Sequence, residues 1–477
     1  MRRLYLTMSF LVLSIPLLLA QADSGSALTL DQCIDYALEN TVVVKNAVLD
    51  ERIATARVRE TVGIGLPQVS GNVTVIQNQK LPRFFTSYDP TSGFFDFSQV
   101  PGIQPGDVIA AQNFFQLKSS GNAALNINQI LFNGSYLVGL QAANTYKELS
   151  LRATDQTKEQ LVEQVTKAYY SVLVNRERMK LFDTNIERVD SLFITTKALY
   201  ENGFAESIDV DRIEVTLNNL KTERNKFEKL QELSVELLKF QMNYPKDQPL
   251  QVSGEFTRES VQVDLNSYLQ DWDYKNRPDY QVLETNRKLQ NLNLKNNYAA
   301  ALPNLSAFAN MGYSTQSPSV SGLFKTNSGV SDDGQVGPDK WYSFSSFGVS
   351  LNIPLFSGLQ RTYKVQQEKL TLQKIENGFT SLKRGIDIEI KQATISYQNN
   401  QEALEAQERN MKLAQNIARV TKIKYEQGLG SNLEVVEAES SLKEAQINYY
   451  NALFDAAIAK TDLDKAFGKL VSVSDDN

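Results

Sequence analysis

Apolar residues recur in two different rhythms along the chain, one typical of strands and the other typical of helices. Four short segments alternate apolar and polar side chains with a period of two, as half-buried strands do. They lie at about residues 69–75, 125–131, 305–313 and 347–355. Pro67 and Pro303 precede two of them, at points where a helix has to stop and an extended chain begins.

Between these segments, apolar residues step by three and four positions over unusually long stretches, which predicts amphipathic helices. One series runs unbroken from Leu161 to Tyr200, and the same register recurs from Ile386 to Tyr425. A third series runs from Val435 to Ala466 and is rich in alanine, which permits close helix approach. The shared register predicts coiled-coil packing. A continuous helix from Ser135 to Tyr200 would reach on the order of 100 Å.

Three landmarks occur twice in the same order, which indicates a duplicated unit. The pairs are Tyr200–Gly203 with Tyr425–Gly428, Ile127–Gly134 with Leu351–Gly358, and Gly65–Ser70 with Ala301–Ser306, at offsets of 225, 224 and 236. We therefore predict a first structural repeat over residues 23–243 and a second over 274–468. An inter-repeat segment would occupy residues 244–273, and residues 469–477 would form a tail.

The first 22 residues have the pattern of an export signal. Arg2 and Arg3 precede an apolar stretch from Met8 to Ala20, and Ala20-Gln21-Ala22 fits a cleavage site after Ala22. The alternative is a transmembrane helix, which the short stretch and the lack of a stop-transfer pattern disfavour. No later stretch approaches the roughly 18 apolar residues of a spanning helix. We expect an exported chain whose net charge changes from −6 to −8 when two arginines are removed.

The amino-acid composition excludes most kinds of catalytic and metal-binding site. The chain has no histidine, which excludes Ser-His, Cys-His and histidine-ligand sites. Its single cysteine, Cys33, excludes an internal disulfide and reads as a buried small residue. Acidic residues outnumber basic ones by 55 to 49, which argues against nucleic-acid binding. Asp332 and Asp333 fit a solvated turn. We expect no catalytic residue, cofactor or metal site, and no enzyme activity.

Four amphipathic strands in an exported chain create a problem of closure. An open sheet leaves unpaired edge groups, which are costly in lipid, so several chains would have to share one barrel. Two chains would supply eight strands and three would supply twelve. The connections at about 79–119 and 315–340 are long, and the first carries aromatic residues, as outer-membrane barrels do. The aromatic residues of the first connection are Phe84, Phe85, Tyr88, Phe94, Phe95, Phe97, Phe114 and Phe115. The alternative to a membrane barrel is a soluble sandwich with disordered loops.

The duplicated order of helix, LPxhS, hairpin, LFxG, long helix, YExG and helix resembles the TolC-like outer-membrane efflux protein family. The resemblance covers residues 28–468. It implies a mainly helical fold in which long coiled-coil helices form an α-barrel and four strands per protomer share a twelve-stranded membrane barrel. It also implies a homotrimer in the outer membrane of a Gram-negative bacterium, with a long periplasmic extension. Residues 244–273 would form a mixed belt around the helical barrel.

The same resemblance implies a function and partners. Such proteins are passive exit ducts of tripartite efflux or type I secretion systems. They dock onto a periplasmic adaptor (membrane fusion) protein and an inner-membrane efflux pump or ABC-type secretion transporter, and outer-membrane lipid surrounds them. The alternative is a pore-less coiled-coil tether or adhesin of the cell envelope, which the alternating strands disfavour. The cargo, whether drug, metal or protein, is not encoded in any motif.

Two turns interrupt the helical register and contain Gly203-Phe204 and Gly428-Leu429. Glycine lets the chain reverse between antiparallel helices. The resemblance implies that these turns are the tips that meet the adaptor. The alternative is that they are ordinary turns.

Glu434 and Glu437 lie just beyond the second tip, three positions apart, so they share a helix face. The resemblance implies that this helix lines a periplasmic gate, where three chains would bring six carboxylates together. A cation would relieve their repulsion, so we expect a cation-selective mouth that divalent ions block. The resemblance adds Asp209 and Tyr425 to the links that hold the mouth closed. The alternative is that Glu434 and Glu437 are solvated coiled-coil positions.

Overall fold

The structure is a computed structural model that describes residues 27–91, 100–111, 113, 115–270, 272–325, 330–331 and 341–471. The expected signal segment, the turn at Asp332 and Asp333 and four of the loop phenylalanines lie outside the described residues. The chain divides into two compact units, each of which combines residues from both halves of the sequence. The helical unit comprises residues 1–48, 153–280 and 382–477, and the sheet unit comprises residues 49–152 and 281–381.

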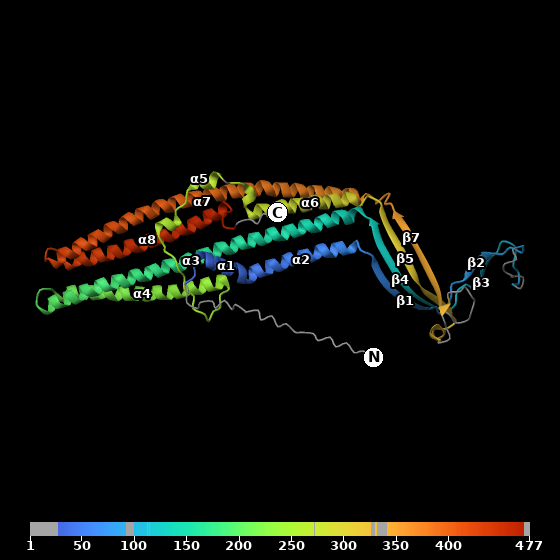
Figure 1. The fold of residues 1–477 in the computed structure, drawn as a ribbon, viewed down its shortest axis with the longest axis horizontal. Helices are drawn as coiled ribbons and strands as arrows, with labels where there is room; N and C mark the ends of the chain where they lie inside the picture. Colours follow the sequence, from blue (N-terminus) through green and yellow to red (C-terminus); the bar gives the residue numbers. More distant parts are fainter. Residues whose placement is uncertain are drawn as a thin grey trace, which may run out of the picture. The chain divides into compact units, whose positions relative to one another are not determined.

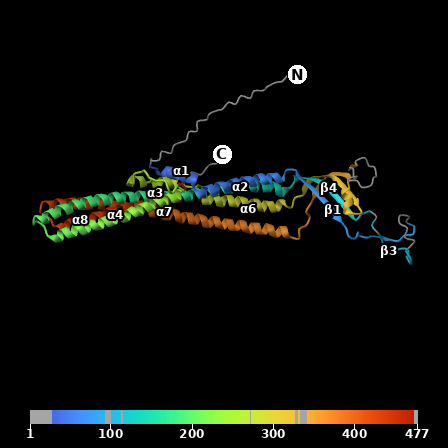
Figure 2. The same ribbon diagram turned by 90° about the horizontal axis from the view of Figure 1, so that it is seen from below.

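Helices dominate the described chain, and the predicted continuous helix from Ser135 to Tyr200 is confirmed by a helix of 68 residues. Its counterpart in the second half has 67 residues. In Figures 1 and 2, α4 returns along α3 and α8 returns along α7. Within the described ranges, no helix has both the length and the apolar character needed to span a membrane. The helices are α1 (Leu30–Asn40), α2 (Val42–Ile64), α3 (Gly134–Glu201), α4 (Ser207–Met242), α5 (Leu265–Gln270), α6 (Pro278–Ala299), α7 (Gln360–Glu426) and α8 (Asn432–Ala466), with short 3-10 turns η1 (Arg258–Val261), η2 (Tyr274–Asn276) and η3 (Val320–Phe324).

The sheet unit contains a sheet in the order β1-β4-β5-β7-β6, and each alternating segment of the sequence overlaps one of its four long strands. These four strands pair antiparallel, and β6 adds to β7 in parallel. Helix α2 ends just before Pro67 and α6 just before Pro303, as predicted. The strands are β1 (Gln68–Gln77), β4 (Ser119–Phe132), β5 (Asn304–Ser317), β6 (Val330–Ser331) and β7 (Trp341–Asn352).

Two details of the strand prediction were wrong. The alternating pattern extends to Leu355, but β7 ends at Asn352 because Pro354 has no backbone N–H to donate to a ladder. The connection between the first two long strands was expected to be a loop, yet it contains a short hairpin of β2 (Phe84–Ser87) and β3 (Val108–Ala111).

The predicted helical register marks the core of the helical unit. Leu161, Val165 and Val172 of α3 are buried, and they belong to one cluster with Leu404 of α7 and Leu453 of α8. Tyr200, the last residue of the first series, is exposed because the helix ends beside it. The alanine-rich series also packs inward, and Ala456, Ala459 and Ala466 are buried.

A row of polar contacts joins α3 to α8 within the helical unit. Lys167 lies 2.7 Å from the Asp462 carboxylate, the Asn185 amide donates to Gln446 at 3.1 Å, and Arg188 lies 2.9 Å from Glu439. The positions rise along α3 as they fall along α8, which is the signature of antiparallel neighbours. These contacts link the first half of the sequence to the second.

Arg277, which is almost fully buried, holds the end of α8. Its guanidinium donates to the carbonyls of Lys465 and Ala466 at 3.3 and 3.2 Å, which are among the carbonyls that a helix end leaves without partners. It also pairs with Asp279 and Glu389, each at 3.0 Å. Two carboxylates therefore compensate a buried cation, and such a charge is very costly when left unpaired.

Glu159 of α3 is buried beside this cluster. Burial, more than any neighbouring charge, raises the pKa of its carboxyl from 4.5 to about 7. Arg277 and Lys465 oppose the shift, whereas Asp279 and Glu389 add to it. The folded chain consequently binds more protons than the unfolded chain between these two pH values.

We expect Glu159→Gln to stabilise the protein at pH 8 by up to about 3 kcal/mol and to change little at pH 4.5. The stabilising effect should appear as pH rises from 4.5 to 7, because the wild type must then bury a carboxylate. Chemical unfolding followed by circular dichroism at several pH values measures it. Glu187→Gln, at an exposed position of the same helix, is the control. Equal effects of both changes at every pH would contradict this assignment.

Candidate functional site

The sheet has two faces of opposite chemistry. Strand register places residues of the same parity on one face, because Leu125 pairs with Met311 while the adjacent Asn126 pairs with Asn310. The odd-numbered positions are mostly apolar and the even-numbered positions mostly polar. The pattern read from the sequence thus extends across all four long strands as two continuous surfaces.

The apolar face is exposed in the sheet unit. Val73 is 74% exposed and Phe347 is 90% exposed, values unusual for such side chains. Besides Leu131 near the end of β4, nine large apolar side chains at odd-numbered positions of the four long strands are exposed. They are Val69, Val73, Val75, Leu125, Met311, Tyr313, Phe347, Val349 and Leu351.

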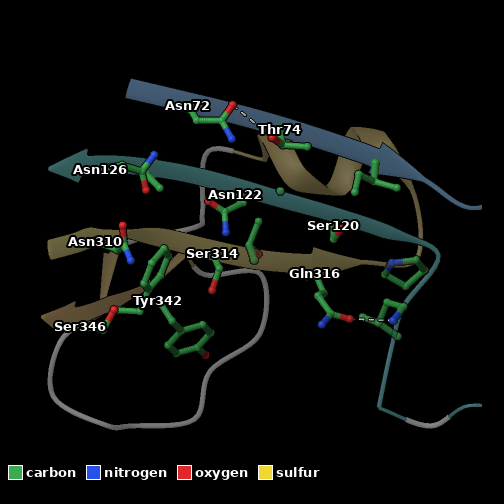
Figure 3. Close-up of a pocket in the computed structure, with 17 residues that line it drawn as sticks. Asn72, Thr74, Ser120, Asn122, Asn126, Asn310, Ser314, Gln316, Tyr342 and Ser346 are labelled. Atoms are coloured by element: carbon green, nitrogen blue, oxygen red, sulfur yellow. Dashed lines mark hydrogen bonds between the residues drawn. The ribbon is translucent and has the colours of Figure 1, made fainter. Parts of the chain in front are cut away.

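The opposite face borders an open cavity of about 1120 Å³. Figure 3 shows Asn72, Asn122, Asn126 and Asn310 reaching into it from three adjacent strands. Serine, threonine, glutamine and Tyr342 complete its polar lining, and no lysine, arginine, aspartate or glutamate is among the described residues that line it. Such a surface offers hydrogen bonds to water and to polar solutes without a fixed charge.

The two predicted tips are turns of nearly identical geometry in the helical unit. Gly203 and Gly428 adopt φ values of 81° and 71°, which glycine takes without strain. The backbone N–H of Phe204 donates to Leu199 at 2.8 Å, and the equivalent N–H of Leu429 donates to Lys424 at 2.8 Å. This bonding closes both helix ends in the same way. Phe204 and Leu429 are each 81% exposed at the outside of their turns.

The predicted gate residues lie near these turns but are not all brought together. Asp209 lies 3.4 Å from Arg212 of its own helix. The hydroxyl of Tyr425 lies 3.1 Å from that of Thr196, a buried residue of α3. Among the described residues, no hydrogen bond or ion pair joins Asp209 to Tyr425.

Glu434 and Glu437 lie in the first two turns of α8 and are exposed. The Ser431 hydroxyl accepts a hydrogen bond from the backbone N–H of Glu434 at 3.3 Å, which caps the helix. Within the described part of the chain, neither carboxylate has a basic partner. Their role at a gate stays a prediction.

The contact between Thr196 and Tyr425 was not predicted from the sequence. Its only trace in the sequence is a hydroxyl residue, Thr196, in an otherwise largely apolar helical register. The pairing depends on how α3 and α7 lie side by side, which no local pattern specifies.

The described residues contain neither a reactive thiol nor a metal-binding cluster. Cys33 is fully buried, as predicted, and burial raises the pKa of its thiol to about 12, so it stays protonated and unreactive. Within the described ranges, no group of three or more histidine, cysteine, aspartate or glutamate residues is placed to hold a metal ion.

The sequence matches the model of a known protein family, and the fold matches solved structures. The family model of the outer membrane efflux proteins matches residues 34–239 and 274–469. The probable efflux pump outer membrane protein TtgC of Pseudomonas putida is 24% identical over 336 residues, which span 69% of this chain and 64% of TtgC, less than two thirds of its length. The outer membrane protein TolC of Vibrio cholerae is 21% identical over 356 residues, covering 73% of this chain and 77% of TolC.

The solved structure of CusC superimposes with a TM-score of 0.68 at 16% sequence identity. The match covers 92% of this chain and 91% of CusC. At that identity the likeness concerns the fold alone. The resemblance read from the duplicated sequence landmarks is confirmed.

Proposed function

The chain belongs to the outer membrane efflux protein family, and we propose that it is an outer-membrane channel that passively conducts substrates out of a Gram-negative cell. The names of its relatives TtgC and TolC support this reading, since one is a probable efflux pump component and both are outer membrane proteins. In our proposal the chain serves as the exit duct of a tripartite efflux or type I secretion system.

The observation that carries this proposal is the two-faced sheet. Its apolar face suits contact with lipid, and its uncharged polar face suits a water-filled path. The four long strands have 10, 14, 14 and 12 residues, which meets the roughly 9–11 residues that a tilted strand needs to cross a bilayer.

We propose that three copies close the sheet. Edge groups of an open sheet have no hydrogen-bond partners in lipid, so membrane insertion favours closure. Three protomers would contribute twelve long strands to one barrel, and their helices would form an α-barrel that extends into the periplasm. Residues 244–273 would form a belt around it.

The partners follow from this proposal. The exposed Phe204 and Leu429, at the turns that Gly203 and Gly428 allow, would meet a periplasmic adaptor protein. The adaptor would connect the duct to an inner-membrane efflux pump or ABC-type secretion transporter, which supplies the energy.

Glu434 and Glu437 would set the ion selectivity of the periplasmic mouth. Glu434 and Glu437 are exposed without basic partners among the described residues, so three copies would concentrate six carboxylates at the mouth. Asp209 and Tyr425 would contribute to the links between helices that keep it closed. We expect Glu434→Ala with Glu437→Ala to reduce both cation selectivity and block by divalent ions, because the repulsion that a cation relieves is removed.

Planar-bilayer recordings of reversal potential and of block by a divalent cation measure both properties. Glu187→Ala with Glu201→Ala, which removes two exposed carboxylates of α3, is the matched control. Unchanged selectivity and unchanged block in the gate variant would show that Glu434 and Glu437 do not line the constriction.

A further inference from the structure

All four connections between the long strands and the helices meet at one end of the sheet. The register aligns Gln68 with Asn128, Leu305 with Phe132, and Asn304 with Asn352. Figure 1 shows α2, α3, α6 and α7 reaching the sheet at this same end. The four connections are therefore neighbours, although they are far apart in sequence.

Large apolar side chains are exposed at every one of these connections. Leu355 is 90% exposed and Phe356 is 82% exposed, between the end of β7 and the start of α7. We call the group the junction collar. It comprises Ile64, Leu66, Leu131, Leu302, Leu355 and Phe356, all exposed.

Positive charge accumulates beside the junction collar. The ten helical residues next to each connection contain six basic residues and only the acidic residues Glu60 and Glu368. The chain as a whole has the opposite balance, 49 basic against 55 acidic. The six basic residues are Arg57, Arg59, Lys295, Arg361, Lys364 and Lys369.

The six cations form no internal ion pair among the residues that the structure describes. By contrast, Arg287 and Lys288, about two turns of α6 before Lys295, pair with Glu376 and Glu148. Arg57 lies over the ring of Tyr146, at 5.2 Å from its centre, which orients the guanidinium but leaves its charge uncompensated. The acidic Glu368 is held by the Gln290 amide.

We propose that the junction collar and its six basic residues bind the anionic headgroups of phospholipids, in the membrane leaflet that faces the helices. Exposed apolar side chains would lie at the level where acyl chains begin, and lysine and arginine can extend past them to the phosphates. Basic residues next to a membrane surface attract anionic lipid electrostatically, and the attraction weakens with salt. This inference rests on the proposed membrane insertion of the sheet.

The test measures lipid selectivity of the purified full chain in phosphatidylcholine bilayers. Traces of spin-labelled phosphatidylglycerol or spin-labelled phosphatidylcholine report which lipid associates with the protein. We expect phosphatidylglycerol to be preferred at least about threefold at low salt and the preference to disappear as ionic strength rises. Equal association of the two lipids with the wild type would overturn the proposal, as would a preference that salt does not reduce.

A variant that neutralises four of these basic residues tests whether they cause the lipid preference. Arg59→Gln, Lys295→Gln, Arg361→Gln and Lys364→Gln together should bring the ratio close to one. The control replaces four exposed lysines of the helical unit that also lack salt bridges within the described ranges, and it should keep the preference. An equal loss in the control would overturn the assignment to the junction collar. The control set is Lys45→Gln, Lys197→Gln, Lys221→Gln and Lys391→Gln.

Two further results distinguish a lipid site from a free-anion site and from a failure of insertion. Inorganic phosphate that abolishes the preference at constant ionic strength would identify a free-anion site and overturn the lipid proposal. A wild type that inserts and conducts but shows no lipid preference contradicts this inference alone. A wild type that never inserts contradicts the proposed function as well.

Discussion

Arginine introduced at both Leu125 and Met311 should prevent the protein from entering a membrane. The two positions pair across β4 and β5, close to the middle of each strand and on the exposed apolar face. Arginine on a lipid-facing strand position costs about 2–4 kcal/mol at the bilayer midplane, and three copies of the chain would multiply that cost. The fraction of protein that floats with phospholipid vesicles in a density gradient measures insertion.

The adjacent residues provide a matched control. Asn126 and Asn310 pair with each other on the polar face, one position further along the same strands. Arginine at both positions should leave insertion intact, because the charges would lie in water. Equal insertion of both variants would show that the apolar face does not contact lipid.

Aspartate at Phe204 and Leu429 should abolish export without changing the oligomeric state of the protein. Both side chains are at the outside of the turns and make up their apolar surface, so the change affects what a partner meets and not the backbone. In the proposed complex these two side chains would be buried against the adaptor, and loss of two such apolar contacts weakens binding by at least about tenfold. Adaptor binding to the purified protein and export by cells that produce it measure the two consequences.

Neighbouring polar positions again supply the control. Asn202→Asp with Gln427→Asp adds the same charge to the same two turns, at exposed residues that are also 225 positions apart. This variant should bind the adaptor and support export. Normal export from the aspartate variant at Phe204 and Leu429 would mean that the two turns are ordinary helix connections.

The periodic parts of the fold could be predicted from the sequence because each signal is local. The step of three and four from Leu161 to Tyr200 required one helix, and α3 spans it without interruption. Pro67 and Pro303 fixed two helix-to-strand changes, since their backbone geometry is incompatible with a continuing helix. Gly203 and Gly428 could also be predicted as turn residues, because glycine lets a helix end and the chain reverse.

Features that depend on distant partners could not be predicted. Arg277 occurs in an ordinary polar stretch, and only the folded chain brings Glu389 and the end of α8 to it. The raised pKa of Glu159 follows from the same packing. The hairpin of β2 and β3 has no clear alternation in sequence, and the junction collar emerges only when four connections meet at one end of the sheet.

Single-channel recording of the purified, unmodified chain in a planar bilayer tests the central claim most directly. If the two-faced sheet closes around a water-filled path, each inserted assembly will add a discrete step of ionic current. An assembled protein that is demonstrably inserted but never produces such steps would contradict the channel and favour a pore-less tether of the cell envelope.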